Sequence, residues 1–177
     1  GEIAMLAEVK TLQRTEKNTV TLVIDSDTGT RYIRKELCGP HPIYAQLQAL
    51  SHPYLPKIFH VEETRTGVVL IEEFIDGANL AEITLPEKQV MVIMEELCEA
   101  LVFLHDQGIL HRDIKPSNLL LAADGHIRLI DFDAAREEKP SSDSDTRLLG
   151  TKGYAPPEQY GFAQTDARAD IYAVGVT

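Results

Sequence analysis

Hydrophobic and polar residues alternate along the first part of the chain. Residues 7–37 alternate over three stretches, with a turn-forming run at 25–29, and this pattern predicts three strands. The alternation returns within residues 61–74, on both sides of a second turn at 64–67, and predicts two more strands. Between the two groups there is room only for a short helix, at 41–50.

A helical repeat replaces the alternation in the middle of the chain. The pattern predicts a helix over 86–107, opened by its proline and stopped by Gly108. Two short apolar runs follow at 119–121 and 127–130, and the Asp-Gly pair between them favours a hairpin. The spacing of apolar residues assigns the buried face of the helix to Val90, Met94, Leu97, Leu101 and Leu104.

Four polar residues around that hairpin have complementary chemistry. Asp113 follows the long helix in a loop, where a carboxylate can accept a hydroxyl proton or orient the hydroxyl for attack. Lys115 can neutralise charge on a transferring phosphoryl group. Asn118 offers a neutral oxygen and Asp131 a charged one, and Mg²⁺ prefers such hard ligands. Each residue alone would suit an ordinary polar turn, but the ordered set is specific for phosphoryl transfer.

The run His111–Asn118, followed by Ile130–Asp133, resembles the catalytic and metal-binding loops of the eukaryotic-type protein kinases. The lysine two residues after the aspartate is similar to that of the serine/threonine branch, which includes bacterial kinases. Two later segments carry the resemblance further. Gly150–Glu158 resembles the loop that docks the substrate, and Asp166–Gly175 resembles the start of the central helix of the large lobe.

The resemblance implies an α+β fold with two lobes, ATP and Mg²⁺ as cofactors, and transfer of the γ-phosphate to Ser/Thr hydroxyls of protein substrates. Residues 1–74 would form an N-terminal lobe with an antiparallel sheet and a short helix. Residues 75–177 would form part of a mainly helical C-terminal lobe. That lobe would contain the helix 86–107, the catalytic loop 111–118, the metal loop 131–133, the activation segment to 158 and the start of the central helix at 166–177.

The same resemblance implies a nucleotide site. Lys35 takes the place of the strand lysine that binds phosphate, Glu72 that of the gatekeeper, and Asp131 that of the metal-binding aspartate. Backbone groups of Glu73 and Ile75 would face adenine. The apolar residues that would sandwich the purine are Val20, Ile33 and Leu120.

The chain departs from the family pattern at the phosphate loop. All three glycines of that loop are replaced, by Gln13, Thr15 and Asn18, although glycine lets bare backbone approach phosphates closely. We therefore expect this loop to cover phosphates less well, and nucleotide affinity to suffer.

The second departure concerns the short helix, where Ile43 occupies the place of the glutamate that normally pairs with the strand lysine. Lys35 is therefore expected to turn to Asp131, to Glu36 or Glu72, or to ATP phosphates, because a half-buried ammonium without a partner is costly. Two functions stay open: a serine/threonine kinase, with Asp113, Lys115 and Asn118 as its catalytic residues, or a pseudokinase that binds nucleotide or acts as a scaffold with little or no phosphotransfer.

A loop rich in Ser and Asp at 136–148 offers candidate phosphorylation sites, with Arg112 as the cation that would receive the phosphate. An unregulated, solvated loop is the alternative. Asp133 replaces the glycine after Phe132, and its side chain is expected to restrict a backbone flip there. The candidate sites are Ser141, Ser142, Ser144 and Thr146.

Composition narrows the choice of partners and compartment. The net charge of −11 argues against nucleic acid and anionic membrane surfaces. No apolar run is long enough to span a bilayer, and the two cysteines lie far apart, which suits a cytoplasmic protein. At 177 residues the chain is expected to be a fragment whose exposed C-lobe surface promotes self-association.

Overall fold

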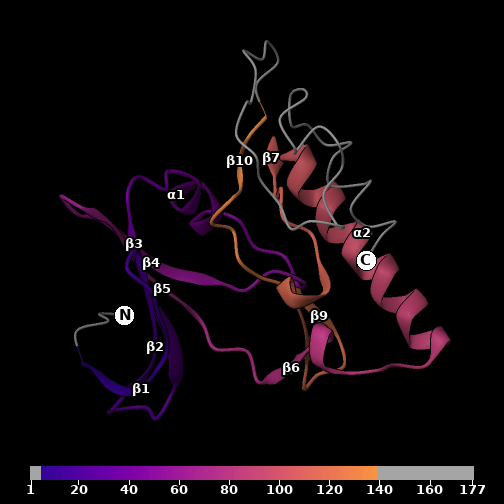
Figure 1. Ribbon diagram of the computed structural model, residues 1–177, viewed down its shortest axis with the longest axis horizontal. Coiled ribbons are helices and arrows are strands. Elements are labelled where there is room, and N and C mark those ends of the chain that lie inside the picture. The colour runs from indigo at the N-terminus through magenta and orange to yellow at the C-terminus, as the bar shows by residue number, and fades with distance from the viewer. Residues whose placement is uncertain (1–4, 139–177) are drawn as a thin grey trace. The chain divides into compact units, whose positions relative to one another are not determined.

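The computed structural model describes residues 5–138 (Figure 1). The expected docking loop, central helix and phosphorylation sites lie outside these residues. The chain divides into two compact units. The first contains the chain up to Ser51 and the segment 56–75, and the second contains residues 52–55 and continues from Asp76.

The first unit is built on a five-stranded antiparallel sheet with the strand order β1-β2-β3-β5-β4. This confirms the α+β fold and the five strands expected from alternation. β4 begins earlier than expected because Glu72 of β5 pairs with Ile58 and extends the ladder past a bulge. The strands are β1 (Leu6–Arg14), β2 (Asn18–Asp25), β3 (Arg31–Cys38), β4 (Ile58–Glu63) and β5 (Gly67–Glu73).

Close packing between β3 and β5 depends on one glycine. A Cβ atom at Gly67 would lie 1.7 Å from the carbonyl oxygen of Leu37, a separation that no side chain could tolerate. Next to this contact, Val68 and Leu70 of β5 are almost fully buried. The glycine therefore lets the two central strands meet over the apolar core of the sheet.

The short helix α1 (Ile43–Gln48) packs against β4. Its buried residues are Ile43, Tyr44 and Leu47, which lie on one face at helical spacing. The helix is shorter than the expected 41–50. Pro42, which has no N–H, stands at its N-cap, and the N–H of Ala49 already bonds back to Gln46 and Leu47 at its end.

The second unit is organised around the long helix α2 (Glu87–Asp106), with two small sheets of order β6-β8-β9 and β10-β7. The helix ends at Asp106, directly before the expected stop at Gly108, whose φ of +73° is a conformation that glycine adopts without strain. The remaining elements are β6 (Gly77–Asn79), η1 (Leu80–Glu82), β7 (Ile109–Leu110), η2 (Pro116–Asn118), β8 (Leu119–Ala122), β9 (Ile127–Leu129) and β10 (Arg136–Glu137).

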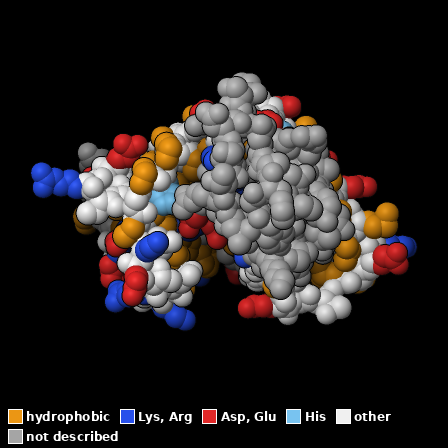
Figure 2. All heavy atoms as spheres, turned by 45° about the horizontal axis from the view of Figure 1, so that its top comes forward, with side chains coloured by type: hydrophobic (Ala, Val, Ile, Leu, Met, Phe, Trp, Pro, Cys, Tyr) orange, Lys and Arg blue, Asp and Glu red, His pale blue; other side chains and the backbone are white. Residues whose placement is uncertain are grey.

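The predicted buried face of α2 is correct at Leu97, Leu101 and Leu104, but wrong at Val90, which is 42% exposed. Val90 lies in the first turn of the helix, whereas Glu96, which accepts from the N–H of Ile127 in β9, lies further along. Met94 is only partly buried. Three other large apolar side chains of α2 are exposed. These three are Met91, Val92 and Val102. In the coloured part of Figure 2, hydrophobic and charged side chains are interspersed.

Candidate functional site

In the second unit, the side chains of Lys115 and Asn118 both approach one carboxylate oxygen of Asp113. The Nδ2 atom of Asn118 donates to the main-chain oxygen of Asp113 at 2.9 Å and to its Oδ2 at 3.2 Å. The Nζ atom of Lys115 lies 3.5 Å from the same Oδ2. An amide and an ammonium therefore hold the carboxylate of Asp113 in one orientation, as a group that accepts a proton at a fixed place must be held.

The backbone of Asn118 links this loop to the next one. Its N–H donates to the carbonyl of Lys115 at 3.0 Å, and its own carbonyl accepts from the N–H of Ile130 at 2.9 Å. Asn118 is 5% exposed. Because Ile130 directly precedes Asp131, this bond fixes the register between the two residues expected to hold metal.

Asn79, at the end of β6, supports the loop from a third segment. Its Nδ2 atom donates to the carbonyl oxygen of Ser117 at 2.9 Å, and its Oδ1 accepts from the N–H of Ala81. The sequence alone did not predict this role of Asn79. An asparagine just before a short helical turn is a common N-cap signal, but only the fold shows that its Nδ2 atom holds the loop that follows Asp113.

His111, which is buried in the core, forms hydrogen bonds with both of these loops. It is fully buried, its Nδ1 accepts from the N–H of Asp113 at 3.2 Å, and its Nε2 lies 2.9 Å from the carbonyl oxygen of Ile130. Since a carbonyl only accepts, Nε2 carries the proton, and His111 is the neutral Nε2–H tautomer. The ring of Phe132 packs edge-on at 4.9 Å between centroids.

Two non-glycine residues of these loops adopt the left-handed backbone region. Arg112, directly before Asp113, has φ of 73°, and Asp131 has φ of 60°. Each such residue costs on the order of 1 kcal/mol or more, and persists only where the surroundings determine it. Here Arg112 donates to the carbonyl of Ala134 at 3.4 Å, and the Oδ1 atom of Asp131 accepts from the N–H of Asp133 at 3.2 Å.

The oxygen donors near this loop suit a magnesium ion that also binds phosphate. Within residues 5–138, no group of three or more His, Cys, Asp or Glu side chains could hold a metal on its own. Magnesium typically keeps several waters and binds to one or two protein oxygens together with phosphates. Asn118 bonds to Asp113 through Nδ2, and its amide oxygen and the carboxylate of Asp131 are the kinds of ligand that fit such a site.

In the first unit, Lys35 pairs with Glu72 on the neighbouring strand. The Nζ and Oε1 atoms are 3.0 Å apart, and the two side chains are only 14% and 13% exposed. This confirms one of the partners expected for Lys35 once its usual helix glutamate is replaced. Ile43 stands instead in the buried face of α1, a helix that contains no acidic residue.

The strand register places the expected nucleotide residues of the sheet on one face. Val20 lies opposite Lys35, and Ile33 lies opposite Glu72, and directly opposed residues of antiparallel strands share a face. Tyr32 lies on the other face, where its ring contacts Phe59 edge-on at 5.2 Å. The face expected from the alternation of β3 is therefore the face that carries the Lys35–Glu72 pair.

The remaining expected contacts are divided between the units. Glu73 ends β5, where its N–H donates to the carbonyl oxygen of Lys57 at 2.8 Å, and Ile75 follows the strand. Leu120 lies in β8 of the second unit, between Asn79 and Arg128. Because these residues belong to different units, a nucleotide pocket that includes them stays a prediction.

In the loop expected to cover phosphates, the side chain of Thr15 accepts hydrogen bonds from backbone amides of the same loop. The Oγ1 atom of Thr15 accepts from the N–H of Lys17 at 3.3 Å and from that of Asn18 at 3.0 Å. The N–H of Thr15 donates to the carbonyl of Asn18 at 2.8 Å. No described residue of this turn has positive φ. The turn therefore needs no glycine, because it uses its amides internally instead of presenting them to a ligand.

Glu96 of α2 is a buried carboxylate that supports the strand before Asp131. It accepts from His126 Nδ1 at 2.6 Å and from the N–H of Ile127 at 3.3 Å. A hydrogen bond to Glu96 also raises the pKa of Tyr54, whose carbonyl accepts from the N–H of Leu129 at 2.9 Å. This network joins residues far apart in the chain, so no local sequence pattern predicted it.

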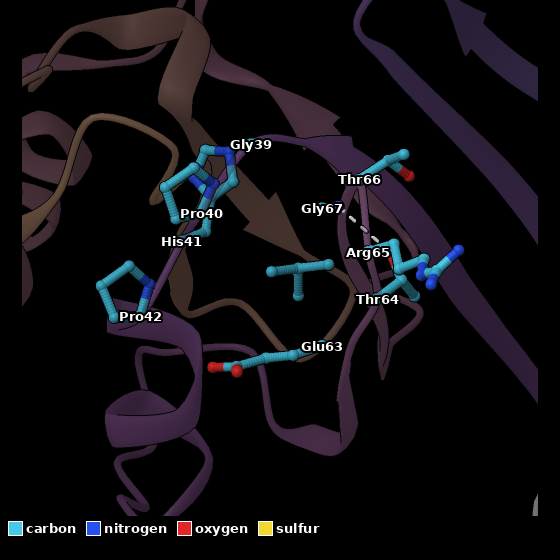
Figure 3. A pocket seen from close by; sticks show the side chains of 10 residues that line it. Gly39, Pro40, His41, Pro42, Glu63, Thr64, Arg65, Thr66 and Gly67 are labelled. Carbon is cyan, nitrogen blue, oxygen red and sulfur yellow. Dashed lines mark hydrogen bonds between the residues drawn. The ribbon is translucent and has the colours of Figure 1, made fainter.

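A cavity of about 270 Å³ lies in the first unit (Figure 3). It lies between the segment before α1 and the β4–β5 turn, and Figure 3 shows the rings of Pro40, His41 and Pro42 on one side of it and Arg65 on the other. None of the expected site residues lines it.

Comparison with known proteins connects this geometry to a family. Residues 41–177 match the model of the protein kinase domain. The chain is 30% identical over 167 residues to the serine/threonine-protein kinase PknB of Mycobacterium leprae. The alignment covers 84% of this chain and 27% of that protein. It is 33% identical over 141 residues to the serine/threonine-protein kinase pkn2 of Myxococcus xanthus, which covers 73% of this chain and 17% of that protein.

A eukaryotic relative is similarly close. The protein kinase C zeta type of Oryctolagus cuniculus is 34% identical over 139 residues, which cover 73% of this chain and 23% of that protein. The chain thus spans about a quarter or less of the length of these three relatives. No helix among the described residues is long and apolar enough to cross a membrane.

Proposed function

Because the chain belongs to the protein kinase family, we propose that it carries out the ATP- and Mg²⁺-dependent phosphorylation of Ser/Thr hydroxyls in protein substrates. The convergence of Lys115 and Asn118 on Oδ2 of Asp113 carries this proposal. A carboxylate held by two donors, in a loop tied to the segment of Asp131, is the arrangement that such a reaction needs.

Each residue has a distinct task in this proposal. Asp113 orients the substrate hydroxyl and accepts its proton, and Lys115 stabilises the charge of the transferring phosphoryl group. Asn118 and Asp131 would hold magnesium, which neutralises phosphate charge when bound. The fixed tautomer of His111 keeps the N–H of Asp113 and the carbonyl of Ile130 engaged, so that both loops keep their register.

Nucleotide binding is proposed for residues of both units. Lys35 would bind phosphates, and backbone groups of Glu73 and Ile75 would bind the adenine edge. The purine would lie between the apolar side chains of Val20, Ile33 and Leu120. In this proposal an N-terminal lobe of residues 1–74 and a partial C-terminal lobe of residues 75–177 share the site.

A second function, a pseudokinase that binds nucleotide or serves as a scaffold, is favoured by two observations. The turn at Thr15 uses its backbone amides internally, and α1 offers Ile43 instead of an acidic residue. Both features weaken nucleotide positioning, while the catalytic loop is complete.

Incubation with γ-labelled ATP, MgCl₂ and a generic Ser/Thr substrate distinguishes the two functions. We expect transfer by the chain, and a loss of at least about 100-fold in Asp113→Asn, since general acid–base groups typically contribute that much. Asp106→Asn, an exposed change at the end of α2, serves as the matched control and should transfer normally. A thermal shift with MgATP and no transfer would instead support the pseudokinase.

A further inference from the structure

The ion pair between Lys35 and Glu72 lies entirely within the sheet. Lys35 is in β3 and Glu72 in β5, one diagonal step apart, because Glu72 lies opposite Ile33 in the ladder. Both side chains are largely buried, at 14% and 13% exposure, and their charged atoms are 3.0 Å apart. Rigid backbone hydrogen bonds therefore fix the origins of both side chains, and burial limits the conformations they can adopt.

The helix that would normally supply this carboxylate offers none. α1 has the sequence Ile-Tyr-Ala-Gln-Leu-Gln, and Ile43 is turned into its buried apolar face. It packs against β4, where the Nε2 atom of Gln48 donates to the carbonyl oxygen of Phe59 at 3.2 Å. A movement of α1 therefore cannot make or break an ion pair with Lys35.

We propose that Glu72 is the positioning residue for Lys35, and that the sheet, independently of α1, holds this lysine ready for nucleotide phosphates. The inference rests on the proposed function for its consequence, phosphate binding. The held ammonium is a feature of the free protein. Because the sheet positions Lys35, the lysine can be in place for phosphate binding without a movement of α1.

The first test measures MgATP binding by isothermal titration calorimetry on the whole chain. Glu72→Gln keeps the shape and removes the charge, and we expect the dissociation constant to rise several-fold, because the Lys35 side chain is then no longer held in place before the nucleotide binds. Glu62→Gln, on the exposed edge strand β4, is the matched control and should bind like the wild type. Equal binding by Glu72→Gln and wild type would overturn the proposal.

The second test needs no nucleotide. A carboxylate favours the charged, non-nucleophilic form of its partner amine, so an N-hydroxysuccinimide ester should acylate Lys35 slowly in the wild type and several-fold faster in Glu72→Gln. Ala45→Gly, an exposed change that weakens α1, should leave the rate unchanged. Faster acylation in Ala45→Gly than in wild type would show that α1 sets the lysine and would refute the inference.

The two tests separate failure of the inference from failure of the proposed function. If the wild type does not bind MgATP, the proposed function fails, while the acylation rates still decide the role of Glu72. Should Glu72→Gln not fold, Glu72→Thr removes the charge with a residue that suits a strand and leaves a hydroxyl beside the ammonium, and it takes its place in both tests. Acylation of Lys35 at the wild-type rate in a folded Glu72→Thr variant would also overturn the proposal.

Discussion

Asp113 is held by neighbours that approach it from its own loop. Lys115 and Asn118 meet its Oδ2, and the ring of His111 accepts its N–H. Side-chain placement of this kind depends on short local segments, here a 3₁₀ turn at Pro116–Asn118. At the residue scale, the site is therefore a property of one loop and its anchor at Ile130.

Removing the side chain of Asn118 tests that arrangement. Asn118→Ala deletes both hydrogen bonds to Asp113 in a position that is 5% exposed. We expect phosphotransfer to fall by at least about 100-fold, and the free energy of unfolding to fall by about 1–3 kcal/mol, the usual effect of leaving a buried polar group unsatisfied. Urea denaturation and radiometric transfer assays measure the two effects, and an active Asn118→Ala would contradict the proposed role.

The hairpin between β1 and β2 illustrates the element scale. Its turn is stabilised by the hydroxyl of Thr15, so the replacement of glycine does not leave an empty or strained loop. It produces a different element, a closed turn whose donors are already used. The replacement of the family's glycines therefore produces a turn whose backbone amides are bonded within the turn.

Restoring two of the glycine positions tests this interpretation. Thr15→Gly combined with Asn18→Gly frees the turn, and we expect MgATP to bind several-fold more tightly because backbone amides become available to phosphates. Stability should fall by roughly 1–2 kcal/mol from added chain entropy. Thr66→Gly, in the β4–β5 turn, is the control for flexibility alone and should not change affinity. If the double variant binds MgATP with unchanged affinity, the internal bonds of this turn do not limit nucleotide binding.

At the scale of the whole molecule, residues 52–55 of the connection between α1 and β4 belong to the second unit. His52 packs on Phe103 of α2 at 4.8 Å between ring centroids, and its Nδ1 accepts from the N–H of Tyr54 at 3.1 Å. Burial lowers the pKa of His52, although the nearby Glu99 acts in the opposite direction. The neutral ring is therefore the form that suits this packing.

Stability should consequently depend on pH through His52. Because its pKa is lower in the folded than in the unfolded chain, the unfolded chain binds more protons as pH falls through the ordinary value of about 6.5, and stability is lost below that pH. His52→Phe keeps a ring and removes the titration. We expect the variant to lose less stability than wild type between pH 7.5 and 5.5 in urea denaturation, and an identical loss would exclude His52 as a source.

Local signals were sufficient to predict much of this protein. Strand alternation, the stop at Gly108 and the ordered polar set after α2 all depend on residues close in sequence, and the structure confirms the five strands and the end of the helix. The error at Val90 arose because periodicity gives the direction of a side chain, but not whether a neighbour covers it. The contact of Asn79 with Ser117 joins residues 38 apart, so no local pattern could predict it.

The sequence by itself determined the family, the α+β architecture and the chemical groups of the proposed site, because these follow from residue type and spacing. Tertiary structure decided that Lys35 forms an ion pair with Glu72, since that pairing depends on the register of β3 and β5. It also decided that the turn at Thr15 closes on itself and that Glu96 supports β9. These outcomes depend on distances between segments, which a linear pattern does not contain.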